Sequence, residues 1–319
     1  MLVDPSGRLI DHFRISLTDR CNFRCRYCYP PSGGVELRTR LLDLDEFTRV
    51  ARIGIGLGIR RIKLTGGEPL LSPHVITLAG RLAAMPGLDD LSLTTNGSRL
   101  RLLAGPLHDA GLRRINLSVD SLIPERFAEI CLGGDLHEVL AGFREARRVG
   151  LEVKINTVAL RGWNADEIGA FVRFAAEEQV EVRFIEFMPL CGQGWDKDQF
   201  VSAGELRERL ERHTTLEPLP SDGVARRFRT GTGARIGFIP TMSEPFCEGC
   251  RRIRLTAWGA LRSCLFSERE VDLRGLLRGG ADDEAIAGEF RRAVHVKPAR
   301  NPVLDGADGS RLLIRSVGG

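Results

Sequence analysis

Residues 13–28 read Phe-Arg-Ile-Ser-Leu-Thr-Asp-Arg-Cys-Asn-Phe-Arg-Cys-Arg-Tyr-Cys, a short apolar run that leads into three cysteines. The run Phe13–Leu17 is rich in β-favouring residues and predicts a strand whose carboxyl end carries Cys21, Cys25 and Cys28. Three thiolates spaced CxxxCxxC can hold three irons of a 4Fe–4S cluster and leave the fourth iron open for a ligand. The alternative is a zinc loop, but zinc prefers four protein ligands and usually paired CxxC units.

Further apolar, β-rich runs follow along the chain, and helix-like segments separate them. The runs are Arg61–Leu64, Leu91–Thr95, Arg114–Val119, Val153–Leu160 and Val182–Phe187, and the helix-like segments are Leu44–Leu57, His74–Met85, Arg99–Ala110, Pro124–Val149 and Asn164–Gln179. Such alternation predicts βα units around a parallel sheet. Six units are too few for a closed eight-fold barrel, so the expected α/β fold is an open, partial (β/α)6 barrel of the TIM type.

The ends of these strands carry polar or glycine-rich signatures, in the order TDRC, TGGEP, TTNG, SVD and EFMP. Proteins built from βα units place their sites at the carboxyl ends of the strands. In GGEP, the glycines permit close backbone approach, and the Glu68 carboxylate with the exposed backbone groups could hold an amino group. Taken alone, GGEP would more often be an ordinary turn, whereas TTNG and SVD are equally compatible with a binding role and with a strand-end turn that carries a capping residue.

The pattern changes after residue 189. Residues 190–245 mix short strands with turns, 247–264 contain three more cysteines, and a helical segment is expected near Asp282–Val294. We therefore expect two regions, 1–189 and 190–319.

The second cysteine group is Cys247, Cys250 and Cys264. A structural zinc site would require a fourth Cys or His, and none is obvious nearby, so a second cluster with an open iron is favoured. Arg252 and Arg254 would share one face of a strand and suit a phosphate-bearing substrate beside that cluster. The alternative for this arginine pair is a solvated basic face.

The composition fits a globular protein with a sizeable core, because 43% of its 319 residues are hydrophobic. No apolar stretch approaches the roughly 18 residues of a membrane helix, and the first residues do not resemble a signal peptide, so a cytoplasmic enzyme is expected. The net charge of +4 does not imply a nucleic-acid partner. Only four of the 46 basic residues are lysines, and in such a background a lysine is expected where a compact ammonium, rather than a planar guanidinium, is required.

These motifs resemble the GTP 3′,8-cyclases of molybdenum cofactor biosynthesis, a family of the radical S-adenosylmethionine superfamily. The resemblance runs from Phe13 to Gly319 and includes RISLTDRCNFRCRYC, KLTGGEPLL, TTNG, RINLSVDSL, KINTVALRGWN, RFIEFMPL and FCEGCRRIRLTAWGALRSCLF. It implies a partial barrel closed by the C-terminal cluster region, two 4Fe–4S clusters, and a first cluster that reductively cleaves S-adenosylmethionine. The resulting radical would take the C3′ hydrogen of GTP, C3′ would bond to C8, and the second cluster would hold the purine.

The resemblance also assigns residues. It implies that S-adenosylmethionine is bound by Tyr27, Gly67, Glu68, Thr95, Asn96 and Ser118. It implies that GTP is bound by Arg14, Arg61, Lys63, Lys154, Arg183, Arg252 and Arg254. The terminal Gly318 and Gly319 would assist the radical step. Implied partners are an electron donor, the next enzyme of the pathway (cyclic pyranopterin monophosphate synthase) and a second copy in a homodimer.

The sequence departs from the family pattern beside the cluster ligands, at Tyr29, Arg251 and Ser263. These changes put cluster potential and fine substrate geometry in doubt, but not the reaction. Cys131 and Cys191 have no place in either cysteine group and are expected to be ordinary small or buried residues.

Two rival functions remain open. A radical enzyme that modifies a peptide would also use an auxiliary cluster, although such enzymes usually carry more C-terminal cysteines. A non-catalytic iron–sulfur or zinc protein that binds nucleic acid would show full cysteine ligation and strongly salt-dependent binding.

Overall fold

The computed structural model describes residues 1–29, 40–190, 197–306 and 314. Its centre is a row of six parallel strands whose spatial order follows the sequence, as the βα pattern predicts. The strands are β1 (His12–Ser16), β2 (Arg61–Thr65), β3 (Asp90–Thr95), β4 (Arg114–Ser118), β5 (Glu152–Ala159) and β6 (Glu181–Glu186). The predicted partial barrel is therefore confirmed.

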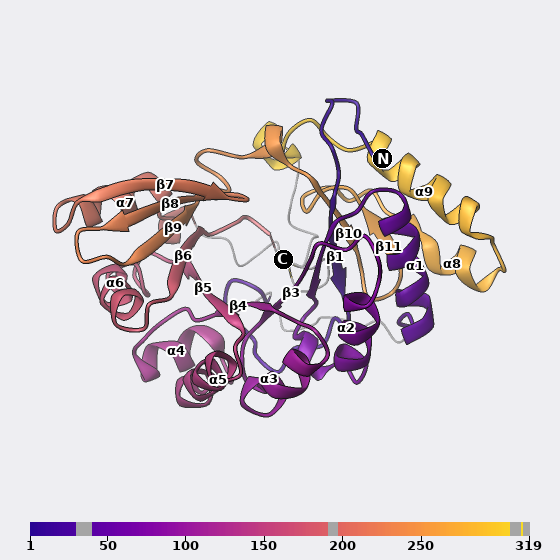
Figure 1. The fold of residues 1–319 in the computed structure, drawn as a ribbon. Coiled ribbons are helices and arrows are strands. Elements are labelled where there is room, and N and C mark those ends of the chain that lie inside the picture. Colours follow the sequence, from indigo (N-terminus) through magenta and orange to yellow (C-terminus); the bar gives the residue numbers. More distant parts are fainter. Residues whose placement is uncertain (30–39, 191–196, 307–313, 315–319) are drawn as a thin grey trace.

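Helices cover the convex outer side of this sheet (Figure 1). They are α1 (Leu44–Gly56), α2 (Val75–Ala83), α3 (Leu100–Asp109), α4 (Pro124–Cys131), α5 (Leu136–Arg148) and α6 (Ile168–Glu177). Successive side chains of a strand point to opposite faces. In β1, Phe13 and Ile15 are fully buried in the main hydrophobic core, so Arg14 projects to the concave face. The same alternation places Lys63 of β2 on that face.

The prediction of one helix over Pro124–Val149 was wrong, because the chain breaks between α4 and α5. Leu132 takes a positive φ of 44° and Gly133 one of 116°, which end the first helix. Asp135 then starts the second helix, since its side chain accepts a hydrogen bond from the His137 backbone N–H at 2.8 Å.

The C-terminal part extends the sheet at both edges, so that the twelve-stranded sheet stays open rather than closing into a barrel. Next to β6 lie β9 (Arg235–Ile239), β8 (Ala225–Thr230) and β7 (Leu216–Asp222), and next to β1 lie β10 (Arg252–Leu255), β11 (Ala260–Arg262) and β12 (Val271–Asp272). β9 and β10 run parallel to their central neighbours, and the outer pairs are antiparallel.

The remaining helices belong to these flanks. They are α7 (Ala203–Glu211), α8 (Leu273–Arg278) and α9 (Asp283–His295), with short 3₁₀ turns η1 (Pro69–Leu71), η2 (Lys197–Gln199), η3 (Cys247–Gly249) and η4 (Pro302–Asp305). In Figure 1 the β7–β9 extension lies on the left and α8 and α9 lie on the right. Within the described part of the chain, no helix combines the length and apolar character needed to cross a bilayer.

Candidate active site

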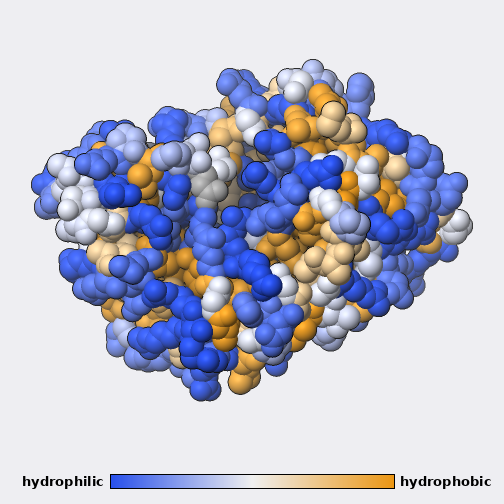
Figure 2. All heavy atoms as spheres, in the orientation of Figure 1, coloured by the Kyte–Doolittle hydropathy of each residue, from blue (hydrophilic) through white to orange (hydrophobic). Residues whose placement is uncertain are grey.

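A cavity of about 320 Å³ lies at the carboxyl ends of the central strands. All six cysteines of the two predicted groups line it, although more than 200 residues separate the groups in sequence. Figure 2 shows the surface hollowed near its centre, between the part that carries β7–β9 and the part that carries α8 and α9. The topology therefore brings both cysteine groups to one site.

The first cysteine loop follows β1 and is held as a tight turn. The backbone N–H groups of Cys28 and Tyr29 both donate to the Cys25 carbonyl, at 2.8 and 2.9 Å. The Arg24 N–H donates to the Cys131 carbonyl at 2.9 Å, which docks the loop on the end of α4. All three thiols of the loop are free of disulfides, as the ligands of a metal cluster must be.

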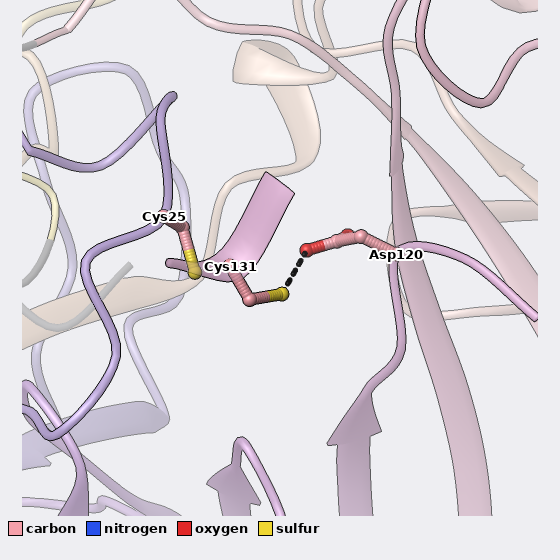
Figure 3. Close-up of side chains that lie close together, drawn as sticks. All are labelled: Cys25, Asp120 and Cys131. Carbon is pink, nitrogen blue, oxygen red and sulfur yellow. Dashed lines mark hydrogen bonds between the residues drawn. The ribbon is translucent and has the colours of Figure 1, made fainter. Parts of the chain in front are cut away.

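The surroundings of this loop disfavour the thiolate forms of Cys21 and Cys25. Burial raises the pKa of Cys21 to about 12. A hydrogen bond with Cys131, together with burial, raises the pKa of Cys25 well above its ordinary value. Figure 3 shows Cys25, Cys131 and Asp120 together, and their ligand atoms lie within 4.8 Å of one another. A thiolate here therefore needs a bound cation to compensate its charge.

Asp120 ties the cysteine loop to the ends of β4 and β5. The Tyr27 hydroxyl donates to Asp120 Oδ2 at 2.6 Å, and the Val158 backbone N–H donates to Oδ1 at 2.9 Å. Burial raises the pKa of Asp120 to about 6. The residue prediction omitted Asp120, although its place at the end of the SVD strand was the available signal.

The GGEP turn packs directly on the cysteine loop. A Cβ at Gly67 would lie 2.2 Å from the Arg20 carbonyl oxygen, so only glycine fits. The Gly67 N–H donates to the Thr18 carbonyl at 2.7 Å, and the Glu68 N–H donates to the Arg20 carbonyl at 2.8 Å. These contacts fix the turn at the edge of the cavity.

The Glu68 carboxylate joins this turn to the TTNG loop. Its Oε1 accepts from the Leu70 N–H at 2.9 Å and from the Thr95 hydroxyl at 2.7 Å, while Oε2 accepts from the Asn96 N–H at 2.7 Å. The side chain is only 1% exposed, and burial raises its pKa to about 7. Every predicted residue for S-adenosylmethionine lines the cavity: Tyr27, Gly67, Glu68, Thr95, Asn96 and Ser118.

Five of the seven predicted substrate cations also line the cavity, namely Arg14, Lys63, Arg183, Arg252 and Arg254. Arg14 stands in register with Lys63 on one neighbouring strand and with Arg254 on the other. Burial, reinforced by the surrounding arginines, lowers the pKa of Lys63 and of Arg14 well below their ordinary values. Burial and Arg252 lower the pKa of Arg254 to about 9. This crowding of like charge favours a polyanionic ligand.

The other two predicted substrate cations lie outside the lining. Arg61 is exposed at the amino end of β2, with a nitrogen 3.3 Å from His12 Nε2. Lys154 is buried in β5, and its Nζ lies 3.2 Å from a Glu152 oxygen.

The second cysteine group comes from η3, from the residue that follows it, and from the turn after β11. The Cys250 N–H donates to the Cys247 carbonyl at 3.1 Å, and Cys264 lines the same cavity from the turn that follows β11, the strand paired with β10. Burial opposes ionisation of Cys250, but Arg252 and Lys297 outweigh it and lower the pKa of this thiol to about 7. The described lining contains no histidine, so three thiols at each group suit a cluster with an open iron better than a zinc ion.

The residues that depart from the family pattern lie beside the two cysteine groups. Arg251 forms an ion pair with Asp11, and Ser263 is buried in the lining. The Arg24 guanidinium lies 5.9 Å from the centre of the Tyr29 ring. Cys191, Gly318 and Gly319 fall outside the described residues.

An open α/β sheet with a three-cysteine loop after its first strand defines a radical S-adenosylmethionine protein, and residues 15–175 match the model of the Radical SAM superfamily. Residues 180–303 match the model for Molybdenum Cofactor Synthesis C. The chain is 46% identical to a GTP 3′,8-cyclase of Moorella thermoacetica, covering 95% of this chain and 96% of the relative. It is 44% identical to a GTP 3′,8-cyclase of Syntrophomonas wolfei, covering 96% of each. The chain therefore belongs to the GTP 3′,8-cyclase family.

Solved structures resemble this chain in fold. Streptococcus suis SuiB bound to S-adenosylmethionine aligns with a TM-score of 0.62 at 16% identity, covering 89% of this chain and 68% of that one. SuiB bound to its precursor peptide SuiA aligns with a TM-score of 0.63 at the same identity, covering 89% and 67%. At this level of identity the likeness concerns the fold alone.

Proposed function

We propose that this chain converts GTP to 3′,8-cyclo-7,8-dihydroguanosine 5′-triphosphate in a radical S-adenosylmethionine reaction, the first step of molybdenum cofactor biosynthesis. The observation that carries the proposal is the set of five cations facing one cavity between two three-cysteine groups. Crowded buried cations repel one another, and a triphosphate would offset that repulsion. The names of the relatives, GTP 3′,8-cyclases over nearly the whole chain, support the same substrate.

Cys21, Cys25 and Cys28 would hold the first 4Fe–4S cluster. When bound, that cluster and S-adenosylmethionine supply a 5′-deoxyadenosyl radical through reductive cleavage. The loop ends around it would hold S-adenosylmethionine through the backbone at Gly67 and through polar groups at Thr95, Asn96 and Ser118. Glu68 would set the spacing of these loops, because its carboxylate already bonds both of them. Tyr27, whose hydroxyl donates to Asp120, would line one side of the S-adenosylmethionine site.

Arg14, Lys63 and Arg183 would take the triphosphate. Arg14 and Lys63 project from the neighbouring strands β1 and β2, and Arg183 reaches the same cavity from β6, farther along the sheet. A planar guanidinium binds phosphate oxygens in pairs, whereas the lysine acts as a compact point charge. Arg252 and Arg254 would complete the site beside the second cysteine group. The assignment of Arg61 and Lys154 to GTP stays a prediction, because neither lines the described cavity.

Cys247, Cys250 and Cys264 would hold a second 4Fe–4S cluster that binds the purine. A role for Gly318 and Gly319 in the radical step stays a prediction. So do the division into regions 1–189 and 190–319, a cytoplasmic location, an electron donor, delivery to cyclic pyranopterin monophosphate synthase, a homodimer and the absence of a nucleic-acid partner.

The test is an anaerobic turnover assay. The protein is reconstituted with iron and sulfide, reduced with dithionite, and given S-adenosylmethionine with GTP or, as a control, with guanosine. Mass spectrometry should find 5′-deoxyadenosine and a cyclised product isomeric with GTP, and guanosine should give no cyclised product, because it lacks the triphosphate. Formation of 5′-deoxyadenosine with GTP left intact would refute the substrate assignment and point to another substrate, such as a peptide.

A further inference from the structure

Two buried cations flank the second cysteine group, and neither belongs to the predicted site residues. Arg8 lies in the N-terminal segment before β1 and is 7% exposed. Lys297 follows α9 and is 6% exposed. They come from opposite ends of the chain and approach the same three cysteines.

Arg8 joins three separate segments through one guanidinium. Its Nη1 donates to the Cys247 carbonyl at 2.7 Å and to the Ala299 carbonyl at 2.9 Å, and its Nη2 donates to the Pro298 carbonyl at 2.7 Å. Its Nε donates to Asp4 Oδ2 at 2.6 Å, which fixes the plane of the group. Arg8 therefore anchors the first cysteine of the group to both terminal segments.

Lys297 makes the equivalent connection for the other two cysteines. Its ammonium donates to the Arg252 carbonyl at 2.9 Å, two residues after Cys250, and to the carbonyl of Ser263, which directly precedes Cys264. The same ammonium lies beside the Cys250 thiol. Together the two cations hold the backbone within two residues of every member of the group.

The charge of Lys297 has no carboxylate to balance it, because no ion pair among the described residues includes this side chain. A buried cation is costly unless an anion compensates it, so the site is built for negative charge. A second sign of a ligand is the Asn301 side chain, which is buried in the cavity lining with its Nδ2 unbonded within the described part of the chain. Three cysteine thiolates around a cluster would supply the missing negative charge.

We propose that Arg8 and Lys297 are positioning residues for the second cysteine group, an inference that rests on the second cluster proposed above. Their hydrogen bonds to backbone carbonyls fix the spacing of the three thiolates. Their two positive charges favour the reduced, more negative form of the bound cluster and so raise its reduction potential. No substrate contact is required for either effect.

The test isolates the second cluster in a protein that carries Cys21→Ser, Cys25→Ser and Cys28→Ser. This protein is reconstituted anaerobically, and the rate of iron loss to a chelator and the midpoint potential by electron paramagnetic resonance are measured. Lys297→Met should lose iron roughly tenfold faster and shift the potential to more negative values. Lys297→Arg should restore the potential, because it keeps the charge. Arg8→Gln should also speed iron loss.

The matched control is Arg113→Gln, because Arg113 also donates to backbone carbonyls, those of His108 and Leu112, but lies on the surface. It should change neither the rate nor the potential. In the reciprocal protein, Cys247, Cys250 and Cys264 are replaced by Ser, so that only the first cluster remains. There Lys297→Met should leave the rate of iron loss unchanged. If iron loss from the first cluster increased as much as from the second, the substitution would act through general instability of the protein, and the inference would be overturned.

The experiment distinguishes failure of the positioning role from failure of the proposed second cluster. Unchanged iron loss and potential in both Lys297→Met and Arg8→Gln would overturn the positioning role while leaving the second cluster in place. Failure of the triple-serine protein to hold any cluster, with Arg8 and Lys297 intact, would overturn the second cluster and this inference together.

Discussion

The two cysteine groups offer the same ligands, three thiols each, in opposite electrostatic surroundings. The first group lies beside the buried carboxyl groups of Glu68 and Asp120, and burial raises the pKa of Cys21 to about 12. The second lies among cations, and Arg252 and Lys297 help to lower the pKa of Cys250 to about 7.

This difference teaches that ligand count alone does not define a cluster site. Nearby positive charge stabilises the more reduced state of an iron–sulfur cluster, and nearby negative charge destabilises it. The first site therefore favours a strongly reducing cluster, which suits reductive cleavage of S-adenosylmethionine. At the second site, the surrounding cations would make the proposed cluster less reducing, in keeping with the binding role proposed for it.

The largest expected effect comes from replacing one cysteine in each group, because the first group should be needed for cleavage of S-adenosylmethionine and the second for cyclisation. Cys21→Ser should lower 5′-deoxyadenosine formation by ~10³-fold or more, the scale for removing one member of a catalytic unit. Cys264→Ser should retain some uncoupled cleavage but lose cyclisation. Both products are quantified by mass spectrometry after anaerobic reconstitution. Equal cleavage and cyclisation by the Cys264 variant would sink the two-cluster assignment.

A second prediction concerns the thiols of the metal-free protein. Near pH 7.5 Cys250 should be mostly thiolate and Cys21 almost wholly thiol, so iodoacetamide should modify Cys250 roughly 100-fold faster, allowing for the weaker nucleophilicity of the more acidic thiol. Peptide mapping should give Cys250 an apparent pKa near 7. In urea the modification rates of Cys250 and Cys21 should converge, because unfolding removes the different surroundings. Equal modification rates in the folded protein would contradict the opposite electrostatic surroundings of the two groups.

A third prediction concerns the cations between the two groups. Lys63→Met should weaken GTP binding roughly 30-fold, or about 2 kcal/mol, the scale of a lost hydrogen bond to a charged group. Arg61→Met is the matched control on the same strand and should have a clearly smaller effect, because Arg61 lies outside the cavity lining. Calorimetric titration measures both. Equal losses of GTP affinity in the two variants would contradict the assignment of the triphosphate to the cations that line the cavity.

The smallest expected effect is on stability near the first group. The pKa of Glu68 is about 7 in the folded protein against 4.5 ordinarily, so the folded state favours the protonated form. This contribution to stability is present below pH 4.5 and is lost as the pH rises through 7. Between pH 5 and 6.5 the wild type should lose roughly 1.5 kcal/mol of unfolding free energy relative to Glu68→Gln. Urea titrations of both metal-free proteins at several pH values measure this difference. If the unfolding free energies of the two proteins changed in parallel with pH, the raised pKa of Glu68 would be contradicted.

Local patterns in the sequence carried much of the fold and of the site. The β-rich runs predicted all six central strands to within a residue or two at each end, because a buried parallel strand needs a continuous apolar run. The family resemblance assigned Arg14 and Lys63 to the substrate, and the register of β1 and β2 places them side by side. The break at Leu132 was missed although Gly133 and Asp135, residues typical of a helix end and a helix start, follow it directly.

The sequence by itself determined the two cysteine triads and the strand-end motifs, because spacing along one strand or loop fixes which side chains lie together. Most of the cavity cations followed from the family resemblance, residue by residue. Only the tertiary structure decided that Arg8 and Lys297 meet at the second triad and that Cys131 lies against Cys25. Those contacts join segments from distant parts of the chain. The scarcity of lysine did not single out Lys297, and no local period encodes which strand edge its segment will cover.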